Sequence, residues 1–277
     1  MSVAGRPSIT RFSRLARRMT GSAWADRNVP EEVPVALSFA GTTHAVMMAS
    51  PSDLEDFALG FSLTEGIIGA AEEIERMHVE HLESGIDIQM WLRDAANTRF
   101  TARRRRLAGP VGCGLCGIES IEEAVRPVAK VSQDKLTLSA EDIAQAMRLL
   151  AKDQPFHAQT GAVHAAGFFR PGRGIALIRE DVGRHNALDK LAGALAKAGI
   201  AGATGAIAVT SRLSVEMVQK AAAIGAPAIL AVSAPTALAI RTAEEAGMTL
   251  IALVRGEEFD VFTHSERVTA GGDKHVA

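Results

Sequence analysis

The second half of the chain alternates between short apolar runs and amphipathic runs, and this alternation limits its fold more than any other feature. The apolar runs predict strands and the amphipathic runs predict helices. The predicted strands are 163–169, 174–178, 205–209, 228–232 and 249–254, and the predicted helices are 183–198, 214–223 and 236–246. Strands that alternate with helices favour a mostly parallel sheet with covered faces, and therefore an α/β fold. Gly199, Gly225 and Gly247 follow the three helices, as C-terminal caps do.

The first half has a different pattern, typical of an α+β subdomain. Alternating apolar residues predict two hairpins, formed by 33–39 with 43–48 and by 74–82 with 86–92. Between the hairpins, Ser52 and Glu55 have the spacing of a capping box that starts a helix. Ser139 and Asp142 have the same spacing at the start of a later helix.

These patterns divide the chain into five parts. The predicted parts are a disordered basic tail (1–28), an N-terminal α+β subdomain (29–108), a cysteine loop with its helix (109–135), an α/β domain (136–267) and a second tail (268–277). The first tail carries six arginines against the single acid Asp26. Arg17 and Arg18 have no apolar run after them, so an export signal is not predicted.

The composition excludes several classes of protein. The 277 residues carry a formal net charge of −2, which disfavours nucleic acid as a partner of the whole chain. Aromatic residues make up 4% and tyrosine is absent, which disfavours base stacking. Two cysteines make no disulfide framework, so a reducing cytoplasm is expected. No apolar run approaches the roughly 18 residues of a membrane span.

Both cysteines, Cys113 and Cys116, lie in the glycine-rich stretch 109–117. Four arginines, Arg103 to Arg106, precede this stretch, and residues 118–125 after it read as an amphipathic helix. A nearby helix N-terminus and positive charge both favour the thiolate form of a cysteine, which is the reactive form. A reactive thiol on an exposed loop is the leading interpretation of the pair.

Two alternatives for this C-x-x-C pair stay open. As half of a zinc site it would need distant histidines, because no second C-x-x-C and no H-x-x-x-H follows it. The candidate histidines are His44, His157, His164 and His185. A thioredoxin-like redox pair is the second alternative, although the strand-then-helix pattern typical of that motif is missing.

Polar residues gather just after the predicted strands of the second half. The segments are 179–186, 210–214, 233–236 and 255–258, and they contain Ser211, Arg212, Ser233 and Arg255. Ligands of such sheets bind at the carboxyl ends of the strands, and hydroxyls, arginines and helix N-termini suit phosphate. The pattern therefore predicts a phosphorylated ligand, with simple helix capping as the alternative. His164 and His185 have a plain interpretation as structural residues.

Five stretches of the chain form a distinctive set, namely 111–117 (VGCGLCG), 160–166 (TGAVHAA), 180–191 (EDVGRHNALDKL), 211–220 (SRLSVEMVQK) and 231–236 (AVSAPT). Together they resemble the FdhD/NarQ family of accessory sulfurtransferases. The resemblance extends from about Val29 to about Arg267, and the 180–191 stretch is its most specific part.

The resemblance implies a function and its residues. Family members take sulfur from a cysteine desulfurase as a persulfide, here on Cys113, with Cys116 in an accessory role. They pass it to the molybdenum of bis-molybdopterin guanine dinucleotide, which formate dehydrogenase uses; GDP mimics part of this cofactor. The implied cofactor contacts are Leu253, Val254, Arg255, Gly256, Glu257 and Glu258. The resemblance also implies a cytoplasmic homodimer and a C-terminal domain similar to the cytidine deaminase fold, without its zinc or any other structural metal.

Three rival functions differ in what they require. A thiol–disulfide oxidoreductase needs both cysteines. A zinc-dependent deaminase needs His-x-Glu and Pro-Cys-x-x-Cys, whereas this chain has His164-Ala165-Ala166 and no proline directly before Cys113. A nucleotide-binding module would leave the cysteines unused.

Overall fold

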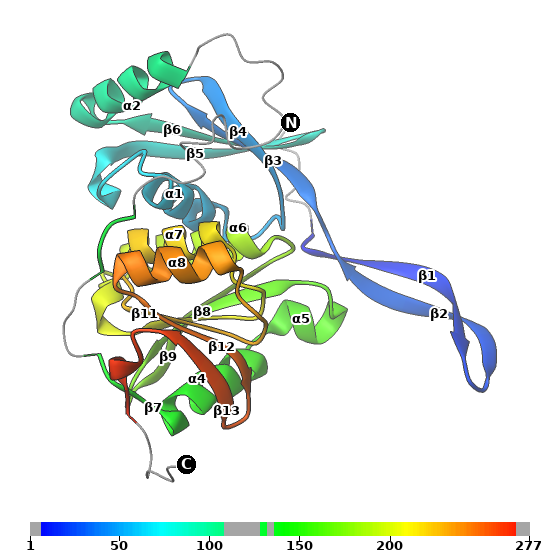
Figure 1. Cartoon of the computed structure of the whole chain (residues 1–277). Coiled ribbons are helices and arrows are strands. Elements are labelled where there is room, and N and C mark those ends of the chain that lie inside the picture. Colours follow the sequence, from blue (N-terminus) through cyan, green and yellow to red (C-terminus); the bar gives the residue numbers. More distant parts are fainter. Residues whose placement is uncertain (1–6, 108–127, 132–135, 270–277) are drawn as a thin grey trace.

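The computed structural model describes residues 7–107, 128–131 and 136–269. These residues form a small N-terminal sheet with its helices, a larger sheet with helices on both faces, and a long two-stranded ribbon that projects to one side (Figure 1). No described helix is long and apolar enough to cross a membrane.

The larger sheet has six strands in the order β13-β12-β11-β10-β8-β9. The strands are β8 (His164–Arg170), β9 (Gly174–Asp181), β10 (Ala206–Val209), β11 (Ala228–Ala231), β12 (Thr249–Arg255) and β13 (Glu258–Thr263). Only the β10–β11 and β11–β12 pairings are parallel. The prediction of a mostly parallel sheet is therefore wrong: β8–β9 and β12–β13 are joined by tight turns, and parallel pairing requires a long crossover connection.

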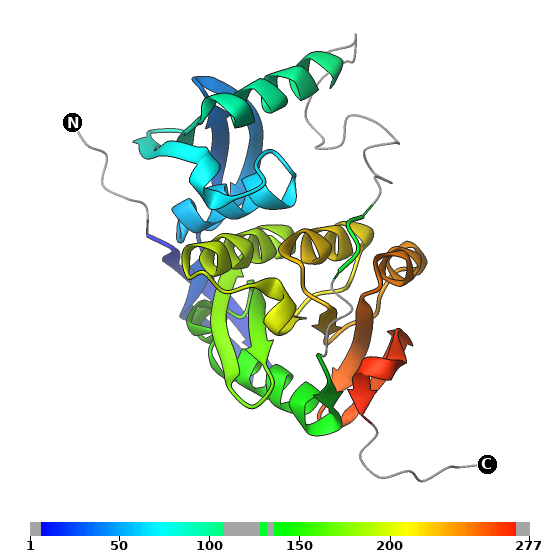
Figure 2. The ribbon, with the colours of Figure 1, turned by 90° about the vertical axis from the view of Figure 1, so that its left-hand side faces the viewer.

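This sheet is the middle one of three layers (Figures 1 and 2). Helices α6 (Arg184–Lys197), α7 (Val215–Ile224) and α8 (Ala237–Ala246) cover one face, and α4 (Ala140–Lys152) covers the other. Successive side chains of a strand point to opposite faces. Accordingly Ile207 and Val209 pack in the cluster under α6–α8, whereas Ala206 and Ala208 pack in the cluster against α4. The expected α/β architecture with helices on both faces is confirmed.

The N-terminal sheet has the order β4-β3-β6-β5. Its strands are β3 (Val33–Phe39), β4 (Thr42–Ala49), β5 (Ile74–Leu82) and β6 (Gly85–Leu92). Both predicted hairpins are present, and parallel pairing of β3 with β6 joins them. Helices α1 (Leu54–Thr64) and α2 (Asp94–Leu107) follow β4 and β6, and the arginine run 103–106 lies in α2, a helix that the sequence pattern did not predict.

The two predicted capping boxes have different outcomes. Ser139 caps α4 and is bonded reciprocally with Asp142, as predicted. The box expected at Ser52 is absent, because α1 starts one residue later. Its N-cap is Asp53, in a left-handed conformation (φ 50°, ψ 38°) and without a side-chain capping bond.

The smaller elements complete the body. They are β7 (Leu138–Ser139), α5 (Pro155–Thr160), β14 (Val268–Thr269), and the 3₁₀ turns η1 (Ala71–Glu73), η2 (Gly202–Thr204) and η3 (Ser265–Arg267). Because β14 pairs with β7, residues 268 and 269 belong to the body and the predicted C-terminal tail does not begin there.

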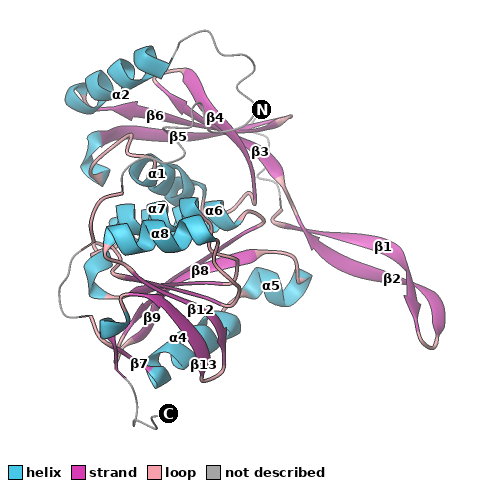
Figure 3. Ribbon diagram, in the orientation of Figure 1, coloured by secondary structure: helices cyan, strands magenta, loops and turns pink. Residues whose placement is uncertain are grey.

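The predicted disordered tail is also corrected. Residues 9–30 form an antiparallel hairpin of β1 (Ile9–Arg18) and β2 (Gly21–Pro30), a separate two-stranded sheet in Figure 3. The pairing runs without interruption from Ile9 with Pro30 to Arg18 with Gly21. The prediction failed because it weighed the arginines, whereas the hairpin depends on the cross-strand pairing of 9–18 with 21–30, which the order of apolar residues does not reveal.

Helices α1 and α6 bring the two sheets together. A Cβ atom placed on Gly60 of α1 would lie 1.7 Å from the carbonyl oxygen of Asp189 in α6. Likewise, a Cβ on Gly193 of α6 would lie 2.0 Å from the carbonyl oxygen of Asp56 in α1. The two helices therefore contact each other through their backbones, which only glycine permits at these positions.

Candidate functional site

The loops predicted to bind a phosphorylated ligand meet at one edge of the six-stranded sheet. Parallel β10, β11 and β12 end there. Loops 210–214 and 232–236 are joined by Leu213 N–H to Ala234 O (3.3 Å) and by Thr236 N–H to Leu213 O (2.9 Å). The end of β12 joins them through Leu253 N–H, which donates to Ser233 O (3.5 Å). The structure thus brings together three segments that are up to 43 residues apart in the sequence, from Thr210 to Leu253.

The polar residues predicted in these loops differ in what they offer a ligand. Ser211 is only 5% exposed, and its hydroxyl donates to the carbonyl of Arg212 (2.9 Å). The Arg212 side chain is exposed and Ser233 is half-buried. Arg212 and Ser233 are therefore more accessible to a ligand than Ser211.

The predicted cofactor stretch 253–258 spans the end of β12, its turn and the start of β13. Leu253 has a positive φ of 58° beside a break in the β12–β13 register. Val254 is 3% exposed and packs in the α4-side cluster, so only its backbone faces a ligand on this edge. Arg255 pairs with Glu258 across the turn, and both are exposed. A left-handed leucine is a costly conformation, and such strain is concentrated at functional sites.

Two helix N-termini at this edge lack a capping side chain. The N-cap of α6 is Gly183, and the N-cap of α7 is Ser214, whose hydroxyl makes no capping bond. By contrast, Thr236 caps α8 by accepting from Ala239 N–H. Uncapped N–H groups with a helix dipole behind them attract anions.

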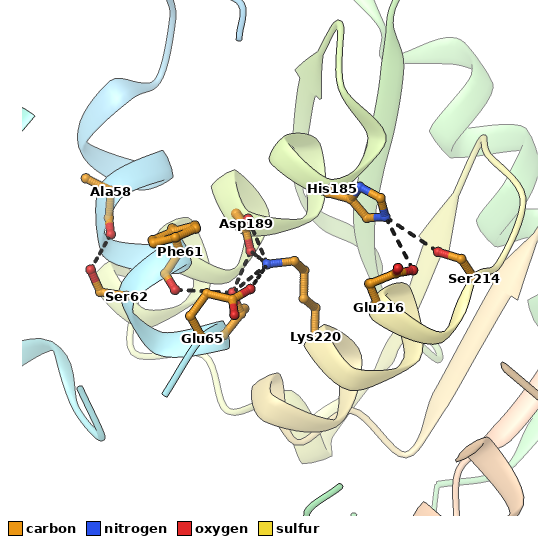
Figure 4. A network of polar contacts seen from close by, with 10 residues as sticks. Ala58, Phe61, Ser62, Glu65, His185, Asp189, Ser214, Glu216 and Lys220 are labelled. Atoms are coloured by element: carbon orange, nitrogen blue, oxygen red, sulfur yellow. Dashed lines mark hydrogen bonds and ion pairs between the residues drawn. The ribbon is translucent and has the colours of Figure 1, made fainter. Parts of the chain in front are cut away.

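His185, in the first turn of α6, faces α7 (Figure 4). Its Nε2 lies 3.5 Å from Ser214 Oγ and 3.9 Å from Glu216 Oε2. Burial lowers the pKa of His185 to about 4, with help from the positive charges of Arg184 and Lys220 and against the charge of Glu216. At neutral pH this imidazole is uncharged, so it exchanges hydrogen bonds without adding charge to the edge.

Glu216 is ionised beside this neutral ring. Burial opposes ionisation, but hydrogen bonds from Ser214 and from its own backbone N–H outweigh burial, and the pKa of Glu216 is lowered. Arg184 lies near both histidines of this region. After burial, its charge is the next cause that lowers the pKa of His164, as it is for His185. In the described part of the chain, Arg184 Nε is buried and has no hydrogen-bond partner.

The 180–191 stretch also holds fully buried groups that pair inside the protein. Asp181 and Lys190 form a fully buried ion pair (2.6 Å). Ser50, at the end of β4, donates its N–H to Asp181 (2.9 Å) and accepts from Lys190 Nζ (3.1 Å). Asn186 donates to the carbonyl of Met48 (2.8 Å). These bonds fasten α6 to the N-terminal sheet, so their role is structural.

A second buried pair joins α6 and α7 to the end of α1 (Figure 4). Lys220 Nζ lies 2.9 Å from Asp189 Oδ1 and 2.8 Å from Glu65 Oε1. Thr64 donates its hydroxyl to Asp189 (2.6 Å). Asp181 thus pairs with Lys190 of its own stretch, whereas Asp189 pairs with Lys220 of another helix.

Cys113 and Cys116 lie outside the described residues. The described chain stops at Leu107, the end of α2, and resumes at 128. Val131 then donates its N–H to the carbonyl of Ala246 at the end of α8 (2.9 Å). Within the described ranges, no three His, Cys, Asp or Glu side chains are grouped closely enough to hold a metal ion.

Sequence reasoning missed the grouping of His185, Ser214 and Glu216. Each lies in a segment that resembles the family, but no spacing rule connects residue 185 to residue 216. The only available signal was that both segments begin a helix directly after a predicted strand, which places the two helix N-termini at one sheet edge.

The chain is similar to known proteins along nearly its whole length. It is 57% identical over 261 residues to the sulfur carrier protein FdhD of Agrobacterium fabrum, covering 94% of this chain and 96% of that protein. It is 46% identical to the protein of the same name from Bordetella bronchiseptica, over 94% of each chain. The crystal structure of a protein from Desulfotalea psychrophila, described as a formate dehydrogenase accessory protein, superimposes with a TM-score of 0.72. That match has 29% identity and covers 95% of this chain and 100% of the other.

The model of the FdhD/NarQ family matches residues 30–269. The match includes both sheets and the strand-end edge with its two uncapped helices. This chain belongs to the FdhD/NarQ family.

Proposed function

We propose that this protein carries sulfur to the bis-molybdopterin guanine dinucleotide cofactor that formate dehydrogenase uses. Relatives that match over most of the chain are named sulfur carriers, and a solved structure of similar fold is described as a formate dehydrogenase accessory protein. The chain has the thiols that such a carrier requires, Cys113 and Cys116, in one glycine-rich stretch.

In the first step Cys113 takes up sulfur. Its thiolate attacks the terminal sulfur of a persulfide on a cysteine desulfurase. A new S–S bond forms on Cys113, the S–S bond of the donor breaks, and the donor cysteine leaves as a thiolate. Cys113 then carries the sulfur as a persulfide, and no oxidant or reductant is consumed.

In the second step the S–S bond on Cys113 breaks and the Cys113 thiolate is released. The transferred sulfur becomes sulfide on the molybdenum of the cofactor, which is the substrate of this step. The two electrons for this reduction come from the reduced metal centre. Cys116 has an accessory role and does not form a required disulfide.

The strand-end edge is the proposed binding place of the cofactor. The observation that carries this assignment is the bond from Leu253 N–H to Ser233 O, which sets the predicted cofactor stretch beside loop 232–236. Arg212, Arg255 and the N-termini of α6 and α7, whose N-cap residues make no side-chain capping bond, supply positive charge for the diphosphates of a guanine dinucleotide. We propose that the protein works as a cytoplasmic homodimer with the desulfurase and formate dehydrogenase as its partners.

Mass spectrometry tests the sulfur-carrying step. After incubation with a cysteine desulfurase and cysteine, the protein is expected to gain the mass of one sulfur atom on Cys113. The Cys116→Ala variant is the matched control and is expected to gain the same mass and to activate formate dehydrogenase appreciably. If Cys113→Ala still gains sulfur and still activates the enzyme, the assignment is wrong. Equal and complete loss in both variants favours a thiol–disulfide oxidoreductase, which needs both thiols.

A further inference from the structure

The β1–β2 hairpin, residues 9–30, is called the arm here, and it exposes large apolar side chains. Phe12 is 57% exposed, Leu15 59%, Trp24 73%, and Met19 at the tip is fully exposed. Each strand has ten residues and is therefore about 33 Å long. Figure 1 shows the arm extending away from both sheets. Large apolar side chains exposed on both faces of one projecting element mark a binding surface.

The register of the arm places these side chains. Leu15 pairs with Trp24, so the two lie side by side on one face of the ribbon. Phe12 and Arg14 point to the opposite face, because successive side chains along a strand point to alternate faces. The arm is a sheet of two strands whose outer edges pair with no other described strand. Such an isolated hairpin is marginally stable in water, so the arm gains stability when another surface covers it.

The described contacts with the body lie at the root of the arm. Arg27 donates to the carbonyl of Thr160 in α5 (3.0 Å). Thr10 donates to Glu31 (2.8 Å), and Glu31 N–H donates to Ser8 O (2.9 Å). These bonds hold the base of the ribbon and leave Trp24 and the tip free of the body. The arm is consequently directed outward and presented to another molecule.

The charge of the arm differs in sign from that of the rest of the chain. The arm has five arginines and one acid, Asp26, which pairs with Arg11 (2.7 Å). No ion pair of Arg14, Arg17 or Arg18 is found in the described part of the chain. The formal charge of the arm is thus +4, and since the whole chain carries −2, the remaining residues carry −6. Opposite charge speeds association and selects the partner.

We propose that the arm binds the body of a second copy of this chain, so that two molecules exchange arms around a twofold axis. A second copy has the complementary charge, and it is present wherever the arm is present, which a transient partner is not. Two symmetric arm contacts form in one closed assembly. Tryptophan and arginine, both on the arm, are the residues that most often dominate binding energy at interfaces. This inference names the element that makes the dimer and does not depend on the sulfur-transfer proposal.

Analytical ultracentrifugation of the full chain tests the inference. The wild type is expected to sediment as a dimer. The double variant Leu15→Glu/Trp24→Glu is expected to weaken the dimer by on the order of 100-fold or more, since each dimer loses two such contacts. The matched control is Val46→Glu/Leu82→Glu, which alters exposed apolar residues of the N-terminal sheet and is expected to stay dimeric. All substituted positions are exposed, so the folded body is expected to be retained in both variants, which far-ultraviolet circular dichroism checks.

Fluorescence gives a second measurement that needs no change in the arm. The chain has two tryptophans, so Trp91→Phe leaves Trp24 as the only one. Its emission is expected to shift to shorter wavelength as the protein concentration is raised through the dimer transition.

Three outcomes overturn the inference. The first is a wild type that is monomeric at up to about 100 μM, and the second is an arm variant as dimeric as the control. The third is a monomer whose arm binds single-stranded DNA, because nucleic acid would then be the occupant. Sulfur loading of Cys113 is measured separately by mass, so failure of one proposal is distinguishable from failure of the other.

Discussion

The imidazole of His185 shows how one position at the strand-end edge depends on residues from another helix. Its ring is partly buried, and Arg184 and Lys220 add to the cost of protonating it, which lowers its pKa to about 4. Glu216 and Ser214 belong to α7, so neither neighbour is fixed by the sequence around His185. A neutral ring beside an ionised carboxylate keeps this part of the edge from changing charge at neutral pH.

The first prediction concerns the acid stability that follows from this pKa. Between pH 6.5 and pH 4 the unfolded chain protonates His185 and the folded chain does not, so the free energy of unfolding falls as the pH falls through this window. From pH 7 to pH 5, wild type is expected to lose about 1–2 kcal/mol more than His185→Gln. Urea unfolding of both proteins at the two pH values measures the difference. Parallel losses would show that His185 is not the group responsible.

The second prediction concerns Arg255 and the proposed cofactor edge. GDP is expected to bind the protein without added metal, and more weakly as salt is raised. Arg255→Ala is expected to weaken binding by roughly tenfold to hundredfold, the cost of one charged hydrogen bond. Calorimetry with GDP, and with CDP as the comparison ligand, measures the effect.

The matched control for this experiment is Arg173→Ala. Arg173 is also exposed in a turn between two strands, but the β8–β9 turn lies at the opposite edge of the sheet. This variant is expected to bind GDP as the wild type does. No binding at about millimolar GDP, or equal binding by Arg255→Ala and wild type, would remove the strand-end loops from the cofactor site.

At the scale of elements, the α1–α6 contact decides how the two sheets meet. Gly60 and Gly193 stand where the backbone of one helix touches the backbone of the other. Glycine normally costs about 1 kcal/mol in a helix relative to alanine. Here glycine is nevertheless favoured over alanine, because the methyl group of alanine would force the two helices apart.

The third prediction follows from this contact. Gly60→Ala is expected to lower the free energy of unfolding by at least about 2 kcal/mol, because a Cβ there overlaps the carbonyl oxygen of Asp189. Gly69→Ala is the matched control, since a Cβ at Gly69 meets nothing within 4 Å and its φ is not in the left-handed range. Urea unfolding compares the two variants. A loss of stability in Gly69→Ala as large as that in Gly60→Ala would contradict the steric explanation.

Elements with a strong local pattern were predictable from the sequence, and those set by tertiary contacts were not. The hairpins, α4 with its Ser139 cap and the helices after Gly183, Ser214 and Thr236 follow from periodicity and capping residues. The direction of β8 in the sheet does not, because a buried apolar run looks the same in parallel and antiparallel pairing. The β1–β2 hairpin was missed because Phe12 and Leu15 are three residues apart and so show no alternation of period two.

The same distinction applies to the candidate site. That loops 210–214 and 232–236 meet at one edge was predictable from the alternation of strands and helices. The hydrogen bond from the Ser211 hydroxyl to the carbonyl oxygen of Arg212 was not predictable, because it depends on one side-chain rotamer. The roles of Cys113, Cys116 and the 253–258 stretch stay predictions.

At the scale of the whole molecule, buried polar bonds tie segments that are far apart in the sequence. Lys190 donates a hydrogen bond to Ser50, which is 140 residues away in the sequence. Lys220 donates one to Thr64, which is 156 residues away. Removing one member of such a group leaves a buried charge unpaired, which typically costs about 3–5 kcal/mol. We therefore expect the N-terminal sheet and the six-stranded sheet to form one cooperative structure.

The fourth prediction is that the two sheets unfold together. In Trp24→Phe the remaining tryptophan, Trp91, lies in β6 and reports on the N-terminal sheet. Its emission and the far-ultraviolet circular dichroism, which reports on all helices, are expected to have the same urea midpoint. Lys220→Met is expected to move both midpoints down by the same amount. Two separate midpoints would mean that the sheets unfold as independent units.

The buried position of Asp181, Asp189 and Lys190 also bears on how relatives of this chain are to be compared. These side chains are fully buried and pair inside the protein. A protein identified as a relative by its 180–191 stretch is therefore expected to have these buried ion pairs, whatever reaction it performs. On the proposal that Cys113 carries the sulfur, the cysteine and not the longer stretch is what distinguishes an active sulfur carrier from a stable protein of the same shape that lacks the activity.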